Sequence, residues 1–404
     1  MQANSFLHHK AKVPSRHHAN NDFQTGKVIS LASAHGIHDI YSSFLAPLLP
    51  VLIERLSIMK MEAGAFLIFQ QMPSILQPVI GHFADRTNFK PMVLLAPAIT
   101  AAAMSLFAVS NSYWMAAGLL LISGLASAIL HAVAPAIISR FSGQQVGRGM
   151  SLWMISGEMG VMLGPILITT VVSFFSVSTA PWLMLGGIAA SAGLTYLLRD
   201  IEFYSPEAQP KSLHGSGKKI LKIFPPLAGI LATRALLRAA VETYMLVYLA
   251  EKGASLWLAG SSLTLLEASG IVGILIANHF YERTGPRWIF FGSSFGSSLL
   301  LFLFLQSSGG LQILLMILLG IVSLCIVPIG MSIVQENFPE NRSFANGMYL
   351  AILFIANSGA GVVMGRLADQ LGTPAAFSWS VWVCLLGIPF VFLLPKKAAN
   401  SLNH

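Results

Sequence analysis

Two related hexapeptides, His82-Phe-Ala-Asp-Arg-Thr87 and His279-Phe-Tyr-Glu-Arg-Thr284, lie 197 residues apart in this chain of 404 residues. Each closes an apolar stretch of about 20 residues, the length that a helix needs to cross the hydrocarbon core of a bilayer. A unit that recurs at almost half the chain length indicates a duplicated membrane domain. We therefore expect two related halves built from membrane-spanning helices.

The composition excludes an ordinary soluble protein. Hydrophobic residues form 55% of the chain and charged residues only 10%, whereas soluble proteins average about 25% charged residues. The two cysteines, Cys325 and Cys384, lie inside apolar runs, so the sequence indicates neither a disulfide framework nor a metal-ligand spacing. The glycine-rich loop of ATP-binding proteins is absent from the sequence. We expect no enzymatic activity, no cofactor and no metal site.

Apolar stretches long enough to cross a bilayer occur twelve times. The sequence therefore predicts an all-α membrane protein with twelve transmembrane helices in two pseudo-symmetric six-helix bundles. The predicted spans are 28–54, 62–83, 91–110, 114–139, 150–175, 179–198, 226–250, 257–280, 288–306, 311–334, 344–366 and 374–395.

These spans divide the chain into an N-terminal tail, a first bundle, a polar linker, a second bundle and a C-terminal tail. In that order, the five segments are 1–27, 28–198, 199–225, 226–395 and 396–404. Pro225 and Pro226 suit the first turn of the seventh helix, where a missing N–H costs nothing.

Lysine and arginine predict the orientation of the chain. Of 24 such residues, 18 fall on the side that holds the N-terminus and two lie within the seventh helix. Four remain on the other side: Arg55, Lys60, Lys252 and Arg366. Because cytoplasmic loops carry the excess of lysine and arginine, we expect a multi-pass protein of the inner (cytoplasmic) membrane with both termini in the cytoplasm. The net charge of +8 then reflects topology rather than a nucleic-acid partner, and the protein is expected to act as a monomer in the lipid bilayer.

The loop after the second predicted helix carries Gly81-His-Phe-Ala-Asp85-Arg86-Thr-Asn-Phe-Lys90. It resembles the major facilitator superfamily signature Gly-x-x-x-Asp-Arg-x-x-x-basic, and the second hexapeptide is a degenerate copy. Gly160-Val-Met-Leu-Gly164-Pro165 resembles the glycine–proline motif of exporters in this superfamily, although small residues four apart also let membrane helices approach closely. We expect Asp85 to pair with Arg140 at the inner ends of the helices. The predicted gating residues are Gly81, Asp85, Arg86, Arg140, Gly164 and Pro165.

Within this superfamily the chain is similar to the fosmidomycin resistance transporters. The similarity rests on His131, on Arg140-Phe-Ser-Gly143, on Gly164-Pro165, on Val334-Gln335-Glu336 and on Gly365-Arg-Leu-Ala368-Asp369. That family tends to follow the histidine with Pro-Glu, whereas His131 precedes Ala132 and Val133 here. An acid-dependent role at this position is therefore not implied.

Ionisable side chains in apolar helices mark the expected functional residues, because each is costly to place in a membrane. Nine stand out: His35, His38, Asp39, His131, Glu158, Arg234, Arg238, Glu242 and Glu267. His35 and Asp39 are four residues apart and share one face of the first helix, so we predict them as a proton-coupling pair. A hydrogen-bonded pair that only fixes helix packing is the alternative. His38 faces another way and is predicted to line the substrate cavity.

Arg234, Arg238 and Glu242 follow one another at intervals of four along the seventh helix. We expect Arg238 to pair with Glu242. Arg234 is then left for Asp39 or for an anionic substrate held by the guanidinium group. A permanent salt-bridge network between the halves is the alternative.

The predicted helices hold more carboxylates than guanidinium groups. An unpaired buried carboxylate tends to bind a proton, because the ionised form loses its hydration. We therefore predict proton exchange at one or more of Asp39, Glu158, Glu242 and Glu267. Further candidates for the substrate cavity, with packing as the alternative, are Gln70, Gln71, His131, Trp153 and Tyr244.

The sequence thus predicts a secondary active transporter that carries protons and a small-molecule substrate by alternating access. Proton-coupled efflux is the leading function, and the resemblance together with the arginine pair implies an anionic, phosphonate-like compound. Proton-coupled uptake of an organic anion would use the same residues. A membrane sensor that binds a ligand without transport is the third possibility.

Overall fold

The computed structural model describes residues 22–84, 87–199, 217–338 and 342–394, and these residues form helices and no strand. The first half of the chain contains α1 (Thr25–Ser42), α2 (Leu45–Leu56), α3 (Lys60–Gln71), η1 (Met72–Leu76), α4 (Gln77–Ala84), α5 (Lys90–Phe107), α6 (Tyr113–Phe141), α7 (Val146–Phe174), η2 (Val177–Leu183) and α8 (Met184–Leu197).

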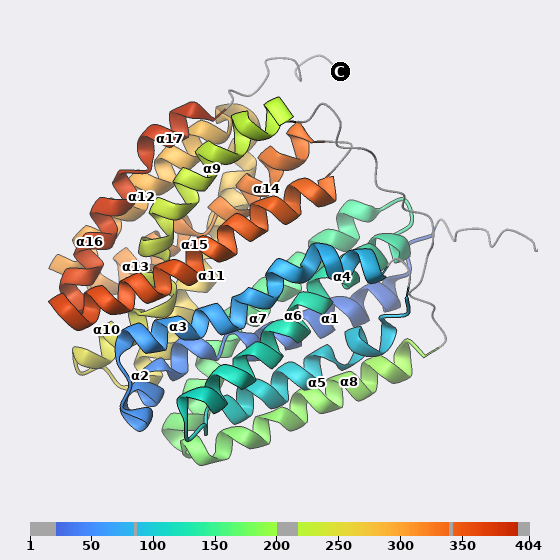
Figure 1. The fold of residues 1–404 in the computed structure, drawn as a ribbon, viewed down its shortest axis with the longest axis horizontal. Coiled ribbons are helices and arrows are strands. Elements are labelled where there is room, and N and C mark those ends of the chain that lie inside the picture. Colours follow the sequence, from blue (N-terminus) through green and yellow to red (C-terminus); the bar gives the residue numbers. More distant parts are fainter. Residues whose placement is uncertain (1–21, 85–86, 200–216, 339–341, 395–404) are drawn as a thin grey trace, which may run out of the picture.

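The second half contains α9 (Gly217–Arg238), η3 (Ala239–Thr243), α10 (Met245–Glu251), α11 (Leu256–Thr284), α12 (Pro286–Gln306), α13 (Gly309–Ser323), α14 (Ile326–Asn337), α15 (Arg342–Leu371), α16 (Thr373–Leu385) and α17 (Ile388–Leu393). Figure 1 shows the helices of the two halves as two groups that lie side by side, with α3 and α15 facing each other between them.

Eleven helical stretches of the described chain are long and apolar enough to cross a membrane. The predicted second span is not among them, because it is divided into α3, the 3₁₀ segment η1 and α4. Pro73 lies in η1 and lacks the N–H that would continue the α-helical bonding. The three segments follow one another from Lys60 to Ala84, over the predicted span 62–83. The prediction of an all-α membrane protein is confirmed.

The start of the seventh helix differs from the prediction. α9 begins at Gly217, within the stretch expected to be linker, and Pro225 and Pro226 lie inside the helix. The expectation for these prolines was wrong because the lysine-rich segment before them was assigned to a loop, although lysine is a good helix former. Proline is tolerated in membrane helices where neighbouring groups satisfy the freed carbonyl oxygens.

The duplication is visible where the first helix of each half is interrupted. α1 ends at Ser42 and α2 begins at Leu45. In the second half, α9 ends at Arg238 and continues as the π-helical segment η3. The repeat offset of 197 places Ser42 opposite Ala239, the first residue of η3. Because π-helical turns are rare and frequently occur at functional sites, the interrupted helices are the first place to search for one.

The halves contact each other through α3 against α15 and α7 against α11. A Cβ atom added at Gly64 of α3 would lie 2.1 Å from the carbonyl oxygen of Gly361 in α15. The two backbones therefore touch, which small residues permit in membrane proteins.

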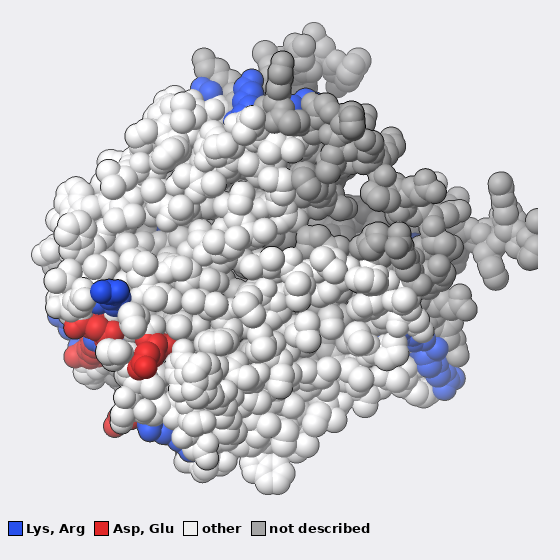
Figure 2. Space-filling view, viewed as in Figure 1, with Lys and Arg blue, Asp and Glu red and all other residues white. Residues whose placement is uncertain are grey.

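The surface is suited to a bilayer. Figure 2 shows charged side chains toward the ends of the molecule and a broad uncharged surface between them. Large apolar side chains are exposed along the long helices, as at Ile122 in α6, Leu275 in α11 and Ile355 in α15. The chain is therefore a multi-pass membrane protein, in which hydrocarbon rather than water covers these residues.

Candidate functional site

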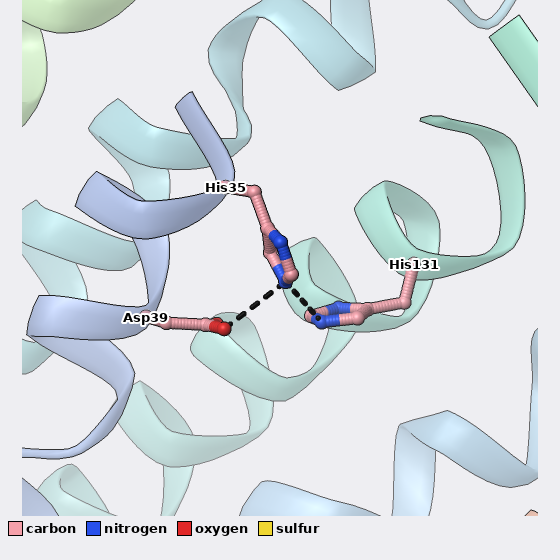
Figure 3. Close-up of side chains that lie close together, drawn as sticks. All are labelled: His35, Asp39 and His131. Carbon is pink, nitrogen blue, oxygen red and sulfur yellow. Dashed lines mark hydrogen bonds and ion pairs between the residues drawn. The ribbon is translucent and has the colours of Figure 1, made fainter. Parts of the chain in front are cut away.

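In the first half, buried polar side chains gather around His35 (Figure 3). Its Nε2 atom lies 3.0 Å from Asp39 Oδ2 and also 3.0 Å from His131 Nε2. α1 supplies His35 and Asp39, and α6 supplies His131. We call these three residues and His38 the histidine cluster. The structure brings His35 and Asp39 together as their spacing predicts, and it adds His131, which sequence reasoning treated separately.

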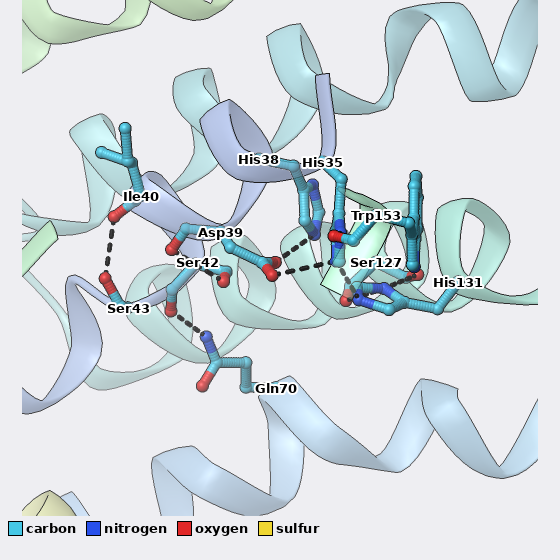
Figure 4. A network of polar contacts seen from close by, with 10 residues as sticks. All are labelled: His35, His38, Asp39, Ile40, Ser42, Ser43, Gln70, Ser127, His131 and Trp153. Atoms are coloured by element: carbon cyan, nitrogen blue, oxygen red, sulfur yellow. Dashed lines mark hydrogen bonds and ion pairs between the residues drawn. The ribbon is translucent and has the colours of Figure 1, made fainter. Parts of the chain in front are cut away.

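The imidazole rings of His35 and His131 each contact a backbone carbonyl group (Figure 4). His35 Nδ1 lies 2.9 Å from the carbonyl oxygen of Trp153, and His131 Nδ1 lies 2.9 Å from that of Ser127. The Trp153 ring stacks on His35 with 3.8 Å between centroids and 9° between planes. Trp153 is 2% exposed. Because its face is occupied by the imidazole, the structure favours the packing alternative for Trp153.

His38 is fully buried, and its Nε2 atom lies 3.8 Å from Asp39 Oδ1. Neither ring nitrogen has a hydrogen-bond partner among the described residues. The prediction that His38 lines the substrate cavity is not met, because its side chain points into the packed interior of the first half beside Asp39.

The two amides predicted to orient substrate make contacts between helices. Gln70 Nε2 donates to the carbonyl oxygen of Ser42 at 2.7 Å, where α1 is interrupted. Gln71 Oε1 accepts a hydrogen bond from Ser358 Oγ at 3.3 Å, which links the two halves. Both residues are half-buried, so they stabilise the interrupted helix and the interface between halves.

In the second half, Arg238 and Glu242 form the predicted ion pair, with 2.7 Å between Nε and Oε2. Arg238 is the last residue of α9 and Glu242 lies in the π-helical segment η3. Their side chains are 35% and 21% exposed, so the pair borders open space rather than the packed core.

Arg234 does not contact Asp39, and the expectation of that pair was wrong. Its guanidinium donates to Ser294 Oγ at 3.1 Å and to the carbonyl oxygen of Ser323 at 3.2 Å. Asp39 is taken by His35 within its own half. Among the described residues, no carboxylate lies within ion-pairing distance of Arg234, which is 7% exposed.

Glu267 of α11 is 8% exposed and feels the charges of Glu242, Glu158 and Arg238. Glu158 comes from α7 of the first half and feels those of Arg238 and Glu242 in turn. We call Glu158, Arg238, Glu242 and Glu267 the central cluster. The charges of three carboxyl groups and one guanidinium group act on one another there, and the set includes residues of both halves.

A pocket opens beside this cluster, between α9, the break of α13 and α14, and α15. Its polar lining consists of Arg234, Arg238, Glu242, Ser323 and Asn357. The cavity volume is ≈ 50 Å³, whereas sites for drug-sized ligands measure about 300–1,000 Å³. In this conformation the pocket admits a small polar group and not a whole organic molecule.

The halves are also joined at the end of the molecule where α3 begins. The carboxylate of Asp369 accepts the backbone N–H groups of Lys60 and Met61 at 3.0 and 2.9 Å. Lys60 Nζ pairs with Glu251 at 2.5 Å and donates to Thr373 Oγ1 at 2.9 Å. A carboxylate at a helix N-terminus satisfies unpaired N–H groups and the helix dipole, so α15 caps α3 across the interface.

Tyr244 belongs to the same set of contacts. Its hydroxyl lies 2.7 Å from the carbonyl oxygen of Lys60 and 3.0 Å from that of Gly361. Because the side chain is fully buried in this interface, the structure favours the packing alternative for Tyr244. We call Lys60, Tyr244, Glu251, Asp369 and Thr373 the clasp. Sequence reasoning missed it, although Lys60 and Asp369 stood out as scarce charges near helix ends.

The predicted gating residues are placed only in part. Asp85 and Arg86 lie outside the described residues, so the pairing of Asp85 with Arg140 stays a prediction. Gly81 lies in α4, and Arg140 lies in the last turn of α6.

Gly164 and Pro165 lie where α7 packs on α1. A Cβ atom added at Gly164 would stand 2.3 Å from the carbonyl oxygen of Ile40. The carbonyl oxygen of Pro165 accepts a hydrogen bond from Thr169 Oγ1 at 2.7 Å. The hydrogen bond lies within α7, whereas the contact at Gly164 shows that the two helices approach closely, which is the simpler of the two interpretations of this motif.

The fold agrees with comparison to known proteins. Residues 31–283 and 227–404 match the Major Facilitator Superfamily. The chain belongs to this superfamily of membrane transporters, and the resemblance seen in the sequence motifs is confirmed.

Individual relatives are distant. The fosmidomycin resistance protein of Escherichia coli (strain K12) is 22% identical over 376 residues, which cover 90% of this chain and 91% of that protein. A bacterial homologue of the human lysosomal transporter Spinster, in an inward-facing and occupied conformation, has a TM-score of 0.74 at 12% identity, with 92% and 96% of the two chains covered. A D-xylose–proton symporter has a TM-score of 0.73 at 12% identity, with 94% and 100% covered. These structural likenesses show the fold alone.

Proposed function

We propose that this protein is a secondary active transporter that exports a small organic anion in exchange for protons. The observation that carries the proposal is Arg234, a buried guanidinium that lines the pocket and has no carboxylate partner among the described residues.

The chemistry of Arg234 favours an anionic ligand. Its partners Ser294 and Ser323 are neutral acceptors, so they satisfy N–H groups without balancing the charge. A buried charge is costly unless an opposite charge lies beside it. Carboxylates and phosphonates match the planar guanidinium fork, and the similarity to a fosmidomycin resistance protein supports a phosphonate.

The central cluster supports proton coupling. Arg238 forms its ion pair with Glu242, and among the described residues Glu267 forms no ion pair of its own. A buried carboxyl group in that position is more stable when it carries a proton. A change of water access during transport alters this balance, and the proton is then released on the opposite side. The position of Glu158 on α7 and of Glu267 on α11 links this step to movement of one half against the other.

The excess of lysine and arginine at the linker and the tails supports a cytoplasmic location for both termini, in an inner-membrane protein. On this orientation the clasp closes the outer side of the transporter. The pocket then loads from the cytoplasm, which is the first step of export.

Purified protein in liposomes tests the proposal. The substrate is radiolabelled fosmidomycin, with a panel of labelled carboxylates and sugar phosphates beside it. The compartment without substrate is made acidic. Protons are then expected to leave this compartment, and the anion is expected to enter it in exchange. Arg234→Ala is expected to abolish this flux, and Arg55→Ala, at an exposed arginine of α2, serves as the control.

The direction of coupling separates export from its rivals. Movement of anion and protons in the same direction would make the protein an uptake symporter. Binding without any flux would make it a sensor. Transport of cations, with none of the anions carried, would remove Arg234 from the centre of the mechanism.

A further inference from the structure

The ring nitrogens of the histidine cluster pose a hydrogen-bonding problem. His35 Nδ1 and His131 Nδ1 each lie 2.9 Å from a backbone carbonyl oxygen. A carbonyl oxygen only accepts, so Nδ1 of His35 carries the hydrogen, and Nδ1 of His131 does so when the Ser127 hydroxyl, 3.2 Å away, does not donate to it. In a neutral imidazole the Nε2 atom then has a lone pair and no hydrogen. The two Nε2 atoms nevertheless face each other at 3.0 Å.

Asp39 adds a third electron donor at the same point. Its Oδ2 atom lies 3.0 Å from His35 Nε2, and one donor atom from each of the three residues lies within 4.8 Å of the others. Three lone pairs directed at one another repel unless a positive species lies among them. A proton on His35 Nε2 points to one partner at a time, whereas a metal ion binds all three.

We propose that His35, Asp39 and His131 bind one divalent transition-metal ion of the Zn²⁺ type. At the tetrahedral angle that Zn²⁺ prefers, two metal–ligand bonds of about 2.1 Å span about 3.4 Å, so the two Nε2 atoms, 3.0 Å apart here, would separate by about 0.4 Å when the ion binds. Two imidazoles and one carboxylate form a set that Zn²⁺, Co²⁺ and Ni²⁺ accept, and the donor set holds no thiolate that would favour Cu(I).

The surroundings of the rings have the features of a prepared metal site. Histidine ligands usually donate their other ring N–H to a carbonyl or carboxylate, which fixes the ring and increases the basicity of the ligating nitrogen. Trp153 and Ser127 supply such carbonyls, and the Trp153 ring fixes the plane of His35 at 3.8 Å. The contacts of His35 with Trp153 join α1 to α7, whereas the contact of His131 with Ser127 lies within α6.

His38 supplies an independent observation. It is fully buried, and by hydrogen-bond geometry neither of its nitrogens has a partner among the described residues, although the backbone of Ala96 lies near the ring. Its Nε2 atom lies 3.8 Å from Asp39 Oδ1. A polar ring in that position is costly unless it gains a partner. A modest shift would make it the fourth ligand, and a water molecule is the alternative in that position.

Charge also favours a doubly charged ion. The carboxylate of Asp39 contacts His35 directly, and the charge of Glu158 acts on His35 as well. The Asp39 side chain is 12% exposed and His131 is half-buried, so the ligands are not sealed from the space between the halves.

Co²⁺ binding to the full-length purified protein tests this site, because Co²⁺ gives visible absorption bands that report its ligands. The protein carries an affinity tag without histidine. Four histidines of the N-terminal tail could bind metal on their own, so all variants are made in a background in which they are alanine: His8, His9, His17 and His18. We expect this background to bind one Co²⁺ ion per chain, with displacement by Zn²⁺.

The test variant is His131→Gln, and the matched control is His279→Gln, at an exposed histidine of α11 outside the cluster. His131→Gln is expected to weaken Co²⁺ and Zn²⁺ binding by about tenfold or more, and His279→Gln is expected to leave it unchanged. Asp39→Asn repeats the test at a second ligand, and thermal unfolding shows that each variant is folded.

Equal affinity in His131→Gln and the background would overturn the proposal. Absence of Co²⁺ and Zn²⁺ binding to the background would also overturn it, and would leave a shared proton as the occupant of the cluster. Because binding is measured without transport, failure here is independent of the proposed anion export.

Discussion

The two halves of this transporter arose from one repeated unit, yet their buried polar groups are arranged in opposite ways. In the first half the side chains of the histidine cluster contact one another and the backbone. In the second half Arg234 and Arg238 line a pocket. The first half brings together nitrogen and oxygen atoms whose lone pairs suit a cation. The second half lines a pocket with two guanidinium groups, which suit an anion.

The two halves share the interruption of the first helix, but they differ in the ionisable residues buried along it. Both first helices are interrupted at matching positions, Ser42 and Ala239. At the repeat offset the buried charged residues of these helices do not match: His35 corresponds to Ala232, Asp39 to Leu236 and Arg234 to Ile37, whereas Glu54-Arg55 at the end of α2 corresponds to Glu251-Lys252 at the end of α10. A duplicated scaffold can therefore acquire different ligands in its halves without a change of fold.

The largest expected effect separates the two clusters by affinity for an anion. Arg234→Ala removes the charge beside the pocket, and loss of such a buried contact costs about 2–5 kcal/mol, or roughly 30-fold or more in affinity. His131→Gln is expected to leave anion affinity nearly unchanged. Equilibrium binding of labelled fosmidomycin to purified protein measures both. Equal losses in the two variants would show that the clusters act as one site.

The second prediction concerns coupling. Glu267→Gln retains shape and burial but cannot carry charge, so the variant is expected to exchange substrate across the membrane without moving protons. Liposomes with an internal pH-sensitive dye measure proton flux, while labelled substrate measures exchange in the same preparation. Glu54→Gln, at an exposed residue of α2, is the control. Proton-driven accumulation at wild-type level in Glu267→Gln would remove Glu267 from the coupling mechanism.

A third prediction tests how the histidine cluster is held. A Cβ atom at Gly160 would stand 2.3 Å from the carbonyl oxygen of Gly36 and 2.9 Å from the Cβ of Asp39. Gly160→Ala is therefore expected to separate α7 from α1 and to cost about 1–3 kcal/mol of stability.

Gly118→Ala is the matched control, because nothing lies within 4 Å of a Cβ atom there. Thermal unfolding in detergent measures both variants. An unchanged unfolding midpoint in Gly160→Ala would mean that the helices adjust freely and that the cluster is not rigidly built.

The smallest expected effect concerns the clasp, which joins the two halves. Asp369→Asn removes the negative charge that caps α3, which is worth about 0.3–1 kcal/mol. Hydrogen exchange at the amides of Lys60 and Met61 is expected to rise up to about fivefold, and the populations of the two transport states shift by the same factor. Unchanged exchange would show that the clasp is held by Lys60 with Glu251 and by Tyr244 instead.

Local relationships could be read from the sequence. The length of apolar stretches predicts membrane helices, because the bilayer sets a minimum length for each crossing. The pairs His35–Asp39 and Arg238–Glu242 follow from a spacing of four, which places two side chains on one helical face whatever surrounds the helix. The superfamily was also accessible, because its signature is a contiguous stretch of residues.

Other features depended on how helices rotate and pack, and no local pattern specifies that. His35 meets His131 from a helix 96 residues away, and Trp153 turned out to support an imidazole rather than a ligand. Arg234 found neutral partners in α12 and beside the end of α13 instead of Asp39.

The sequence by itself determined that this chain is a duplicated, all-helical membrane transporter with scarce ionisable residues in its helices, because bilayer thickness and helical periodicity act on each segment separately. Only the tertiary structure decided which of those residues meet. Close approach of α7 to α1 and of α3 to α15 depends on glycines and on carbonyl groups from distant parts of the chain. The energy of a buried charge depends on these neighbours, and the neighbours exist only once the helices are packed.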